Sequence, residues 1–581
     1  MKLFRNSFLL IPILLLVLAL LPRCAKVVSP TGGLKDTLAP RLVISIPKIY
    51  ATNFQDKKVT ITFDEYIQLK DIQQKLIISP PMINKPEVRL KGKGVEVIFN
   101  EELKENTTYT IYFADGVVDN NESNPIKNFE FVFSTGNSLD SLRLNGVITE
   151  AFSLKPSEGM LVMLYDNLSD STPYIKVPLH VARTDKSGKF ILNNLKSSDY
   201  KMFALKDGNS NYKFDQSTEE IAFIENPIKK ENLTLPSKSK DTLSGRIRLT
   251  SFTEEGKIQS LVNFSRDERR RISLTFTKKP EGGIRLIPLG FEALKNWYIP
   301  EKNTGNDTLT YWIKEDKLSV LDTLNIILNY QKTDSLFQLF PEVDTLKFIY
   351  TEPEKARTRR RDRDKLPETT LMKFKCSIAE GGKAIPTIPM VFTFSTPLSK
   401  VDLKKISLIN ITDSTIIPDL KLTKDSINPR IYRFAYSWKP DTLYNLSVLP
   451  GAFVSLDMVL NDTLDISFTG ANPEEYGTLS LTLTNNSRAT IVELITESDK
   501  LLERLIMKKE EKKAIFRFIN PGKYRLRIIE DTNGNGKWDT GDYLKKRQPE
   551  RVFMFTDIKT KGLINVRANW ENEINFDFLS Q

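Results

Sequence analysis

Short stretches in which apolar and polar residues alternate run along most of this chain. Residues 59–64 and 129–134 are clear examples, and the alternation places their apolar side chains on one face of a strand. Turn-forming pairs such as Asp115-Gly116 and Pro521-Gly522 recur at intervals of about ten residues. This spacing is typical of β-sandwiches. The sequence therefore predicts an all-β protein built from tandem β-sandwich domains in an elongated arrangement.

Two kinds of sequence module each occur twice. Residues 40–136 are echoed by residues 371–470, including the closing strand and its final glycine. In the second kind, a strand that begins at Tyr200 leads to an acidic loop, and the same spacing recurs after Tyr524. Such self-similarity indicates internal duplication.

Composition excludes several classes of function. The net charge is +11, and acids are interspersed with bases, so nucleic acid is not an expected partner. One histidine, His180, and two cysteines rule out most metal and nucleophile sites, and we expect no catalytic residues and no enzymatic activity. His180 is interpreted as structural and Cys376 as a small buried hydrophobe. A carboxylate-dependent hydrolase, with a pair such as Asp64 and Glu65, is the least favoured alternative.

The N-terminus reads as an export signal. Lys2 and Arg5 precede an apolar run of about 14 residues, which is too short to span a bilayer. Cys24 follows at the position of a bacterial lipobox, although Arg23 departs from the small residue expected there. We interpret Cys24 as the lipidated first residue of the mature protein, which would bind the membrane through its N-terminal lipid. The alternative is an ordinary signal peptide with an incidental cysteine.

Several of these segments resemble Bacteroidota envelope lipoproteins that carry a bacterial Ig-like domain of the SbsA S-layer type. The resemblance rests on Cys24 and on residues 29–33, 63–67, 78–81, 105–110 and 119–121. The two duplicated loop-bearing modules are similar to transthyretin-like or carboxypeptidase-regulatory-like sandwiches. The resemblance implies an envelope location and no enzymatic activity, and the signal and tether lead us to expect an outer-membrane lipoprotein. Residues 25–29 lack the acidic run that marks surface export in similar lipoproteins, so the body is expected to face the periplasm.

The chain is several times longer than a typical domain of about 100–150 residues. We predict a signal peptide at 1–23, a lipid-anchored tether at 24–36, a bacterial Ig-like domain at 37–138, a transthyretin-like sandwich at 139–239, a third β-sandwich at 240–351, a charged linker at 352–370, a second Ig-like sandwich at 371–471 and a second transthyretin-like sandwich at 472–581.

The two acidic loops are candidate calcium sites, because their oxygen-bearing side chains alternate as calcium ligands do. The later loop offers Asp531, Asn533, Asn535, the carbonyl of Lys537, Asp539 and Asp542. The earlier loop offers Asp207, Asn209, Asn211, the carbonyl of Lys213 and Asp215, and it is the weaker candidate because Tyr212 replaces the turn glycine. The alternative for both is a polar turn without metal.

The tripeptide Asp-Ser/Thr-Leu recurs and resembles the O-glycosylation acceptor of exported Bacteroidota proteins. Copies at domain junctions are the better candidates, namely Thr37, Ser141 and Thr242. Most other copies are explained by a turn aspartate followed by a β-favouring residue. The favoured function is a non-enzymatic structural or protein-interaction scaffold of the cell envelope. A module that binds a glycan or an envelope protein, with a calcium-pinned loop, is the alternative.

Overall fold

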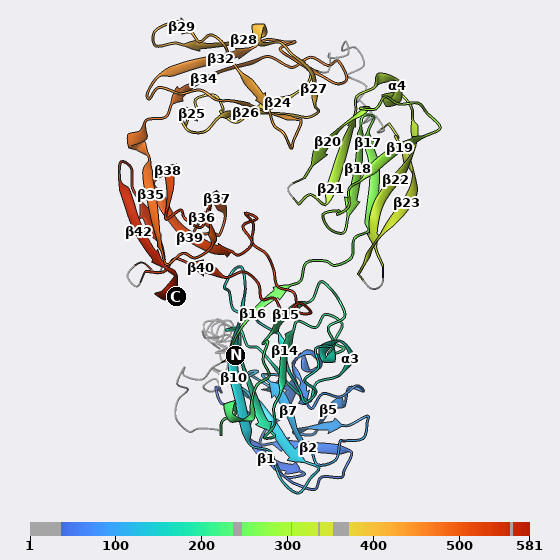
Figure 1. Ribbon diagram of the computed structural model, residues 1–581. Helices are drawn as coiled ribbons and strands as arrows, with labels where there is room; N and C mark the ends of the chain where they lie inside the picture. The colour runs from blue at the N-terminus through green and yellow to red at the C-terminus, as the bar shows by residue number, and fades with distance from the viewer. Residues whose placement is uncertain are drawn as a thin grey trace, which may run out of the picture.

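The computed structural model describes residues 36–235, 247–352 and 371–580, apart from 304, 335, 336, 558, 559 and 561. Over these residues the regular secondary structure is almost entirely strands, as the sequence predicts, and the chain forms five successive β-sandwich domains (Figure 1). The signal peptide, Cys24, Thr242 and most of the charged linker lie outside the described residues. Within these ranges no helix is both long and apolar enough to cross a membrane.

The first sandwich has two main sheets and a small ribbon. One sheet has the order β1-β2-β6-β5, the other β4-β7-β9, and the ribbon joins β3 to β8. The elements are β1 (Leu42–Ile46), β2 (Lys58–Phe63), β3 (Ile67–Leu69), α2 (Ile72–Lys75), β4 (Ile77–Ser79), β5 (Glu87–Lys91), β6 (Gly94–Ile98), β7 (Thr108–Ala114), β8 (Val117–Asp119) and β9 (Phe129–Ser134).

The fourth sandwich repeats this topology and adds the edge strands β25 and β29. Its sheets have the orders β24-β26-β31-β30 and β25-β34-β32-β28-β29, and its ribbon joins β27 to β33. The elements are β24 (Phe374–Cys376), β25 (Lys383–Ala384), β26 (Met390–Phe394), β27 (Leu398–Val401), η3 (Leu403–Lys405), β28 (Ile406–Asn410), β29 (Thr415–Ile416), β30 (Leu422–Lys424), β31 (Ile431–Phe434), β32 (Leu443–Val448), β33 (Phe453–Ser455) and β34 (Leu464–Gly470).

The second sandwich is one seven-stranded sheet, in the order β12-β11-β14-β15-β16-β10-β13, which bends so that its edge strands approach each other. The elements are β10 (Leu142–Glu150), β11 (Leu161–Tyr165), α3 (Thr172–Ile175), β12 (His180–Arg183), β13 (Lys189–Leu195), β14 (Lys201–Leu205), β15 (Glu220–Phe223), η1 (Lys230–Asn232) and β16 (Ile247–Thr253). Strand β16 lies in the range predicted for the third sandwich, but it pairs in parallel with β10 and antiparallel with β15. The second sandwich therefore extends to about residue 253.

The fifth sandwich repeats the pairing of the second. Its first strand, β35, pairs antiparallel with β38 and in parallel with the late strand β42, as β10 does with β13 and β16. The elements are η4 (Pro473–Glu475), β35 (Gly477–Thr484), β36 (Ala489–Thr496), β37 (Leu501–Met507), β38 (Lys513–Ile519), β39 (Gly522–Asp531), β40 (Val552–Met554), β41 (Ile564–Val566), β42 (Glu571–Asp577) and η5 (Phe578–Ser580).

The third sandwich packs the sheet β17-β18-β21-β20 on the sheet β19-β22-β23. Its elements are β17 (Leu261–Glu268), β18 (Arg271–Phe276), β19 (Arg285–Leu289), β20 (Tyr298–Lys302), β21 (Thr308–Ile313), α4 (Asp316–Ser319), β22 (Thr323–Thr333) and β23 (Leu339–Ile349). In β22 every second residue is buried, which is the alternation expected of a strand with one face on a core.

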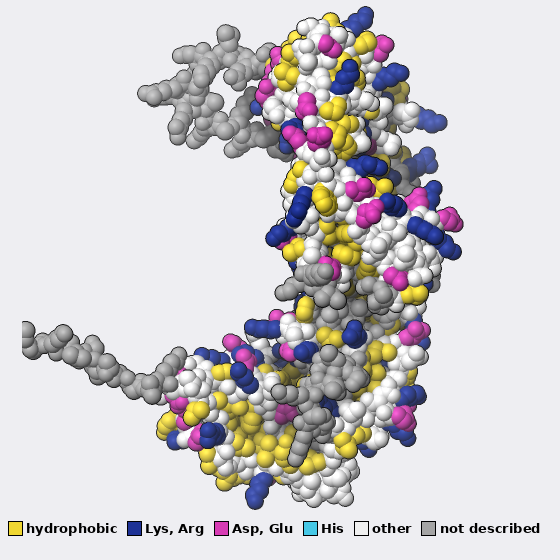
Figure 2. All heavy atoms as spheres, turned by 90° about the vertical axis from the view of Figure 1, so that its left-hand side faces the viewer, with side chains coloured by type: hydrophobic (Ala, Val, Ile, Leu, Met, Phe, Trp, Pro, Cys, Tyr) yellow, Lys and Arg dark blue, Asp and Glu magenta, His cyan; other side chains and the backbone are white. Residues whose placement is uncertain are grey.

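The sandwiches form an elongated arc that is concave on one side (Figure 2). The first two lie together, the third and fourth follow, and the fifth returns to contact the second (Figure 1). Strands β11 and β14 are buried along their whole length because their inner face meets the domain core and their outer face is covered by the neighbouring sandwiches. The later of the two acidic loops lies at this contact between the fifth and second sandwiches.

Candidate functional site

The later acidic loop, residues 531–539, follows directly from β39. Asp531 accepts the Asn535 N–H at 3.1 Å and the Gly536 N–H at 2.8 Å, one on each carboxylate oxygen. Gly536 has a φ of +75°, a conformation that glycine adopts without steric cost. The side-chain amides of Asn533 and Asn535 both donate to Asp539. The loop is thus closed by hydrogen bonds among its own predicted ligands.

Glu550 ties the two ends of this loop together, and the sequence analysis did not single it out. Its carboxylate accepts the Thr532 N–H at 2.6 Å and the Asp539 N–H at 3.0 Å, and the residue is 9% exposed. Asp542, predicted as the last calcium ligand, instead accepts the Lys545 N–H at 3.1 Å. The residue that closes the loop is therefore a glutamate placed just before the next strand.

The earlier acidic loop, residues 207–215, has the same internal hydrogen bonds. Asp207 accepts the N–H groups of Asn211 at 3.2 Å and Tyr212 at 2.8 Å. The amides of Asn209 and Asn211 donate to Asp215 at 3.1 and 2.7 Å. The two loops are therefore structural copies, not merely similar sequences.

Glu219 takes the place of Glu550 in this earlier copy. It accepts the Gly208 N–H at 3.0 Å and the Gln216 N–H at 3.3 Å. In both copies the bridging glutamate stands just before the strand that follows the loop: Glu219 directly precedes β15, and Glu550 lies two residues before β40. Aligning the copies on that strand, and not on the calcium-ligand spacing, would have found it.

The lysines predicted to offer carbonyl ligands donate their own N–H groups within these loops. Lys537 donates to Asn535 at 2.9 Å, and Lys213 donates to Asn211 at 2.7 Å. In the part of the chain that the structure describes, no three His, Cys, Asp or Glu side chains gather closely enough to hold a metal ion. A calcium ion in the later loop would therefore have to take asparagine and carbonyl oxygens besides the two aspartates.

Residues 540–550, called the docking loop below, continue from the later acidic loop onto the second sandwich. Tyr543 is 4% exposed, and its ring centroid lies 5.0 Å from that of Phe203 and 5.1 Å from that of Phe223. Its N–H donates to the buried carboxylate of Glu254 at 2.6 Å. The Tyr543 ring of the fifth sandwich is therefore buried against the outer face of the β14-β15-β16 sheet in the second sandwich.

Further polar contacts surround this ring. Thr540 donates to the Thr253 carbonyl at 2.7 Å, and Gln548 donates to the Phe223 carbonyl at 3.1 Å. Lys546 forms an ion pair with Asp170 at 3.1 Å. Burial raises the pKa of Tyr543, and its buried hydroxyl makes no hydrogen bond with the described protein groups.

The second sandwich makes a reciprocal contact through the turn after β10. Phe152 packs on Trp538 with the two rings tilted by 60° and 5.2 Å between centroids, and it lies under the Arg527 guanidinium at 4.4 Å. Arg527 donates to Glu493 at 3.0 Å, and both side chains are buried within the β36-β39 sheet. Lys155 pairs with Asp499 at 2.9 Å at the edge of this contact. The second and fifth sandwiches are thus held together by two segments, the turn after β10 from the second and the docking loop from the fifth.

The third and fourth sandwiches are joined by a partly buried ion pair. Arg430 donates to both carboxylate oxygens of Glu301, with its Nε 2.9 Å from Oε2 and its Nη2 2.5 Å from Oε1. Trp312 Nε1 donates to the same carboxylate at 2.7 Å. Arg270 adds a second joint by donating to Asp457. These two domains are therefore held in a defined relative orientation.

The remaining predicted residues lie in different places. Thr37 and Ser141 are exposed. His180 is buried in β12 and packs edge-to-face on Tyr200 at 5.7 Å, and burial lowers its pKa to about 4. Cys376 is half-buried against the core of the fourth sandwich, and burial raises the pKa of its thiol.

Sequence comparison identifies one part of the chain. Residues 36–135 match the bacterial Ig-like domain family. This covers most of the first sandwich, whose topology the fourth sandwich shares. No curated protein is similar enough in sequence to match the chain.

Several solved structures are similar to the chain at low sequence identity. The surface layer protein SbsC, domains 1–6, is 10% identical, with 90% of this chain and 67% of that chain covered and a TM-score of 0.13. The N-terminal part of the bacterial S-layer protein SbsC is 14% identical over 37% of this chain, which spans 44% of that chain, with a TM-score of 0.13. A chimeric titin Z1Z2 is 9% identical over 37% of this chain and 97% of that chain, with a TM-score of 0.16. These TM-scores are far below those of proteins that share an overall arrangement.

Proposed function

We propose that this protein is an outer-membrane lipoprotein that acts as a non-enzymatic structural or protein-interaction scaffold. The observation that carries the proposal is the docking of the fifth sandwich on the second through Tyr543 and Phe152. Because the contacts between the second and fifth sandwiches and between the third and fourth are held by buried or paired groups, the two surfaces within each pair keep fixed relative positions. A fixed set of surfaces is what a scaffold needs and what a flexible string of domains does not provide.

A partner-capture experiment tests this role. Full-length protein is crosslinked in its native envelope and purified, beside a Tyr543→Ala variant that opens the contact. We expect a defined envelope protein or glycan to be captured by the wild type and reduced in the variant. Equal capture by both proteins would show that the arrangement of domains is not what the partner recognises.

A glycan-binding module is the alternative, and it needs accessible aromatic rings. Trp297, Trp312 and Trp438 are each at most 3% exposed, whereas Trp570 is 58% exposed. A hydrolase is the least favoured reading, since Asp64 already accepts the Arg41 N–H at 2.8 Å in a turn. Binding to purified envelope polysaccharides, followed by product analysis, separates the two, because only a hydrolase releases shorter products.

Membrane attachment is proposed to depend on Cys24, with the body in the periplasm. The support is the signal-like N-terminus and the absence of an acidic run after the cysteine. Cys24→Ser should move the protein from the membrane fraction to the soluble fraction. Protease added to intact cells should leave the wild type uncut, and digestion would place the body outside the cell.

We propose O-glycosylation at Thr37, Ser141 and Thr242. The exposure of Thr37 and Ser141 supports this, because a bulky glycan there disturbs no packing. Protein purified from its native envelope should exceed the mass of the lipid-modified polypeptide, and Thr37→Ala should remove part of that excess. A mass equal to the bare lipoprotein would contradict the proposal.

A further inference from the structure

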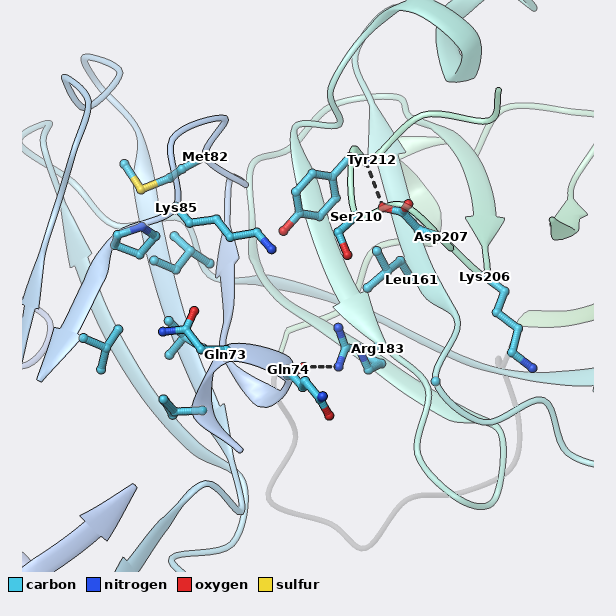
Figure 3. A pocket seen from close by; sticks show the side chains of 16 residues that line it. Gln73, Gln74, Met82, Lys85, Leu161, Arg183, Lys206, Asp207, Ser210 and Tyr212 are labelled. Atoms are coloured by element: carbon cyan, nitrogen blue, oxygen red, sulfur yellow. Dashed lines mark hydrogen bonds between the residues drawn. The ribbon is translucent and has the colours of Figure 1, made fainter. Parts of the chain in front are cut away.

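A cavity of about 410 Å³ lies between the first and second sandwiches. Its apolar wall comes mainly from the first sandwich and includes Leu76, Ile78 and Met82, while Leu161 of β11 faces it from the second (Figure 3). This volume is within the range of about 300–1,000 Å³ that is typical of small-molecule sites, which often form at domain interfaces. The cavity is therefore large enough for a ligand with an apolar body.

Positive charge dominates the polar part of the wall. Lys85, Arg183 and Lys206 line the cavity, and Lys206 is paired with Glu220 at 3.6 Å. Among the described residues, no carboxylate lies within ion-pair distance of Lys85 or Arg183. Arg183 donates to the main-chain carbonyl of Gln74, which carries no net charge.

One carboxylate, that of Asp207, faces three cations on the wall and offsets part of their charge. Asp207 spends both oxygens on N–H groups of its own loop, those of Asn211 and Tyr212. Desolvation of the Arg183 guanidinium lowers its pKa, a cost that Tyr212 and Asp207 offset only in part, while the residue as a whole stays exposed. An anionic group on a ligand would offset that cost.

Tyr212 supplies a second, independent observation. It has a φ of +59°, a left-handed conformation that is strained for a bulky residue, whereas Gly536 stands at the matching position of the duplicated loop with a φ of +75°. Only the copy that lines the cavity carries the ring. Figure 3 shows the Lys85 side chain extending from the first sandwich toward Tyr212 on the second. The Tyr212 ring packs against the buried cluster that includes Leu161, which fixes it as part of the cavity wall.

We propose that this cavity binds an organic anion with an apolar body, the acidic head between Lys85 and Arg183 and the tail against Met82, Leu161 and the Tyr212 ring. The head is a carboxylate or a phosphate, since both suit a guanidinium and an ammonium group. The inference is independent of the scaffold role, because it depends only on the first two sandwiches.

Calorimetric titration of the full mature chain tests the charge preference. The probes are decanoate, decyl phosphate, decanol and decyltrimethylammonium, each below its micelle concentration. We expect one of the two anions to bind at least about tenfold more tightly than decanol, with no binding of the cation. The stronger anion identifies the head group. Equal binding of anion, alcohol and cation would overturn the proposal.

Two variants test the residues. Lys85→Gln with Arg183→Gln should weaken anion binding at least about tenfold, whereas the charge-matched control Lys127→Gln with Lys186→Gln should bind as the wild type does. Wild-type affinity in the first double variant would overturn the proposal.

Tyr212→Gly guards against a folding artefact. Glycine adopts this left-handed φ without strain, which offsets part of the packing lost with the ring, so the variant should stay folded by its melting curve and bind the anion more weakly. Unchanged affinity in this folded variant would show that the ring is not part of a site.

Discussion

Replacing Tyr543 by alanine should open the contact between the fifth and second sandwiches. An aromatic side chain of this size buries about 150–250 Å², worth about 4–6 kcal/mol at ~25 cal/mol per Å². The Tyr543 hydroxyl is buried without a hydrogen-bond partner among the described groups, and such a group costs about 1–3 kcal/mol. The net contribution of the ring to docking is therefore about 3 kcal/mol, which corresponds to about a hundredfold change in the opening equilibrium.

Amide hydrogen exchange measures this opening directly. The N–H of residue 543 donates to Glu254 of the second sandwich, so it exchanges when the contact opens. In Tyr543→Ala this amide should exchange about a hundredfold faster, while amides in the core strands β2 and β26 should be unaffected. Tyr543→Phe is the matched control, since it removes only the unpartnered hydroxyl and should exchange at the wild-type rate or more slowly. A wild-type rate in Tyr543→Ala would refute the reasoning.

Three further predictions follow from individual groups. Burial lowers the pKa of His180 to about 4, so the imidazole takes up a proton at a higher pH in the unfolded chain than in the folded one. The free energy of unfolding should therefore fall as the pH drops from about 6.5 to 4. Urea unfolding at both pH values should show a smaller fall in His180→Leu. Arg430→Ala leaves Glu301 buried without its cation and should cost about 3–5 kcal/mol of docking between the third and fourth sandwiches, visible as faster proteolysis between them, whereas changing both residues to methionine should cost less. Millimolar calcium should raise the melting temperature of the full chain, because an ion at ~100 Kd adds about 2.7 kcal/mol to the free energy of unfolding. A chelator should reverse this rise, and Asp531→Ala with Asp539→Ala should abolish it. An unmoved wild-type melting temperature would mark the loop as a metal-free turn.

The fold class could be predicted because it depends on local patterns. Alternation in residues 59–64 fixes which side chains of β2 are buried, and the repeated modules give the duplicated topology. Strand β16 was assigned to the wrong side of a domain boundary for a physical reason. It closes its sheet by pairing with β10, about a hundred residues earlier, and no local pattern encodes such a partner.

The docking of the fifth sandwich was not predicted, although two signals for it exist. Residues 161–165 and 201–205 lack alternation, which indicates strands buried on both faces. The later acidic loop also has a longer segment before its bridging glutamate than the earlier one, and Tyr543 lies in that segment. Neither signal names the partner surface, because Tyr543 and Glu254 are 289 residues apart in sequence.

The position of the two acidic loops could be predicted, whereas their calcium ligands stay a prediction. The spacing located both acidic loops and their first carboxylates, Asp207 and Asp531. It selected Asp542 over Glu550 because a ligand-spacing rule assumes a contiguous loop, whereas the docking loop separates the two ends here.

Carbodiimide crosslinking tests the return of the fifth sandwich to the second most directly. The reagent joins only amines and carboxylates that already touch, and Lys155 and Asp499 lie 2.9 Å apart across this contact with both side chains partly exposed. Mass spectrometry of dilute, monomeric protein should find the Lys155–Asp499 crosslink within one chain, and Lys155→Arg should remove it. An open string of domains would instead give crosslinks within each sandwich and none between the second and the fifth, which would contradict the account.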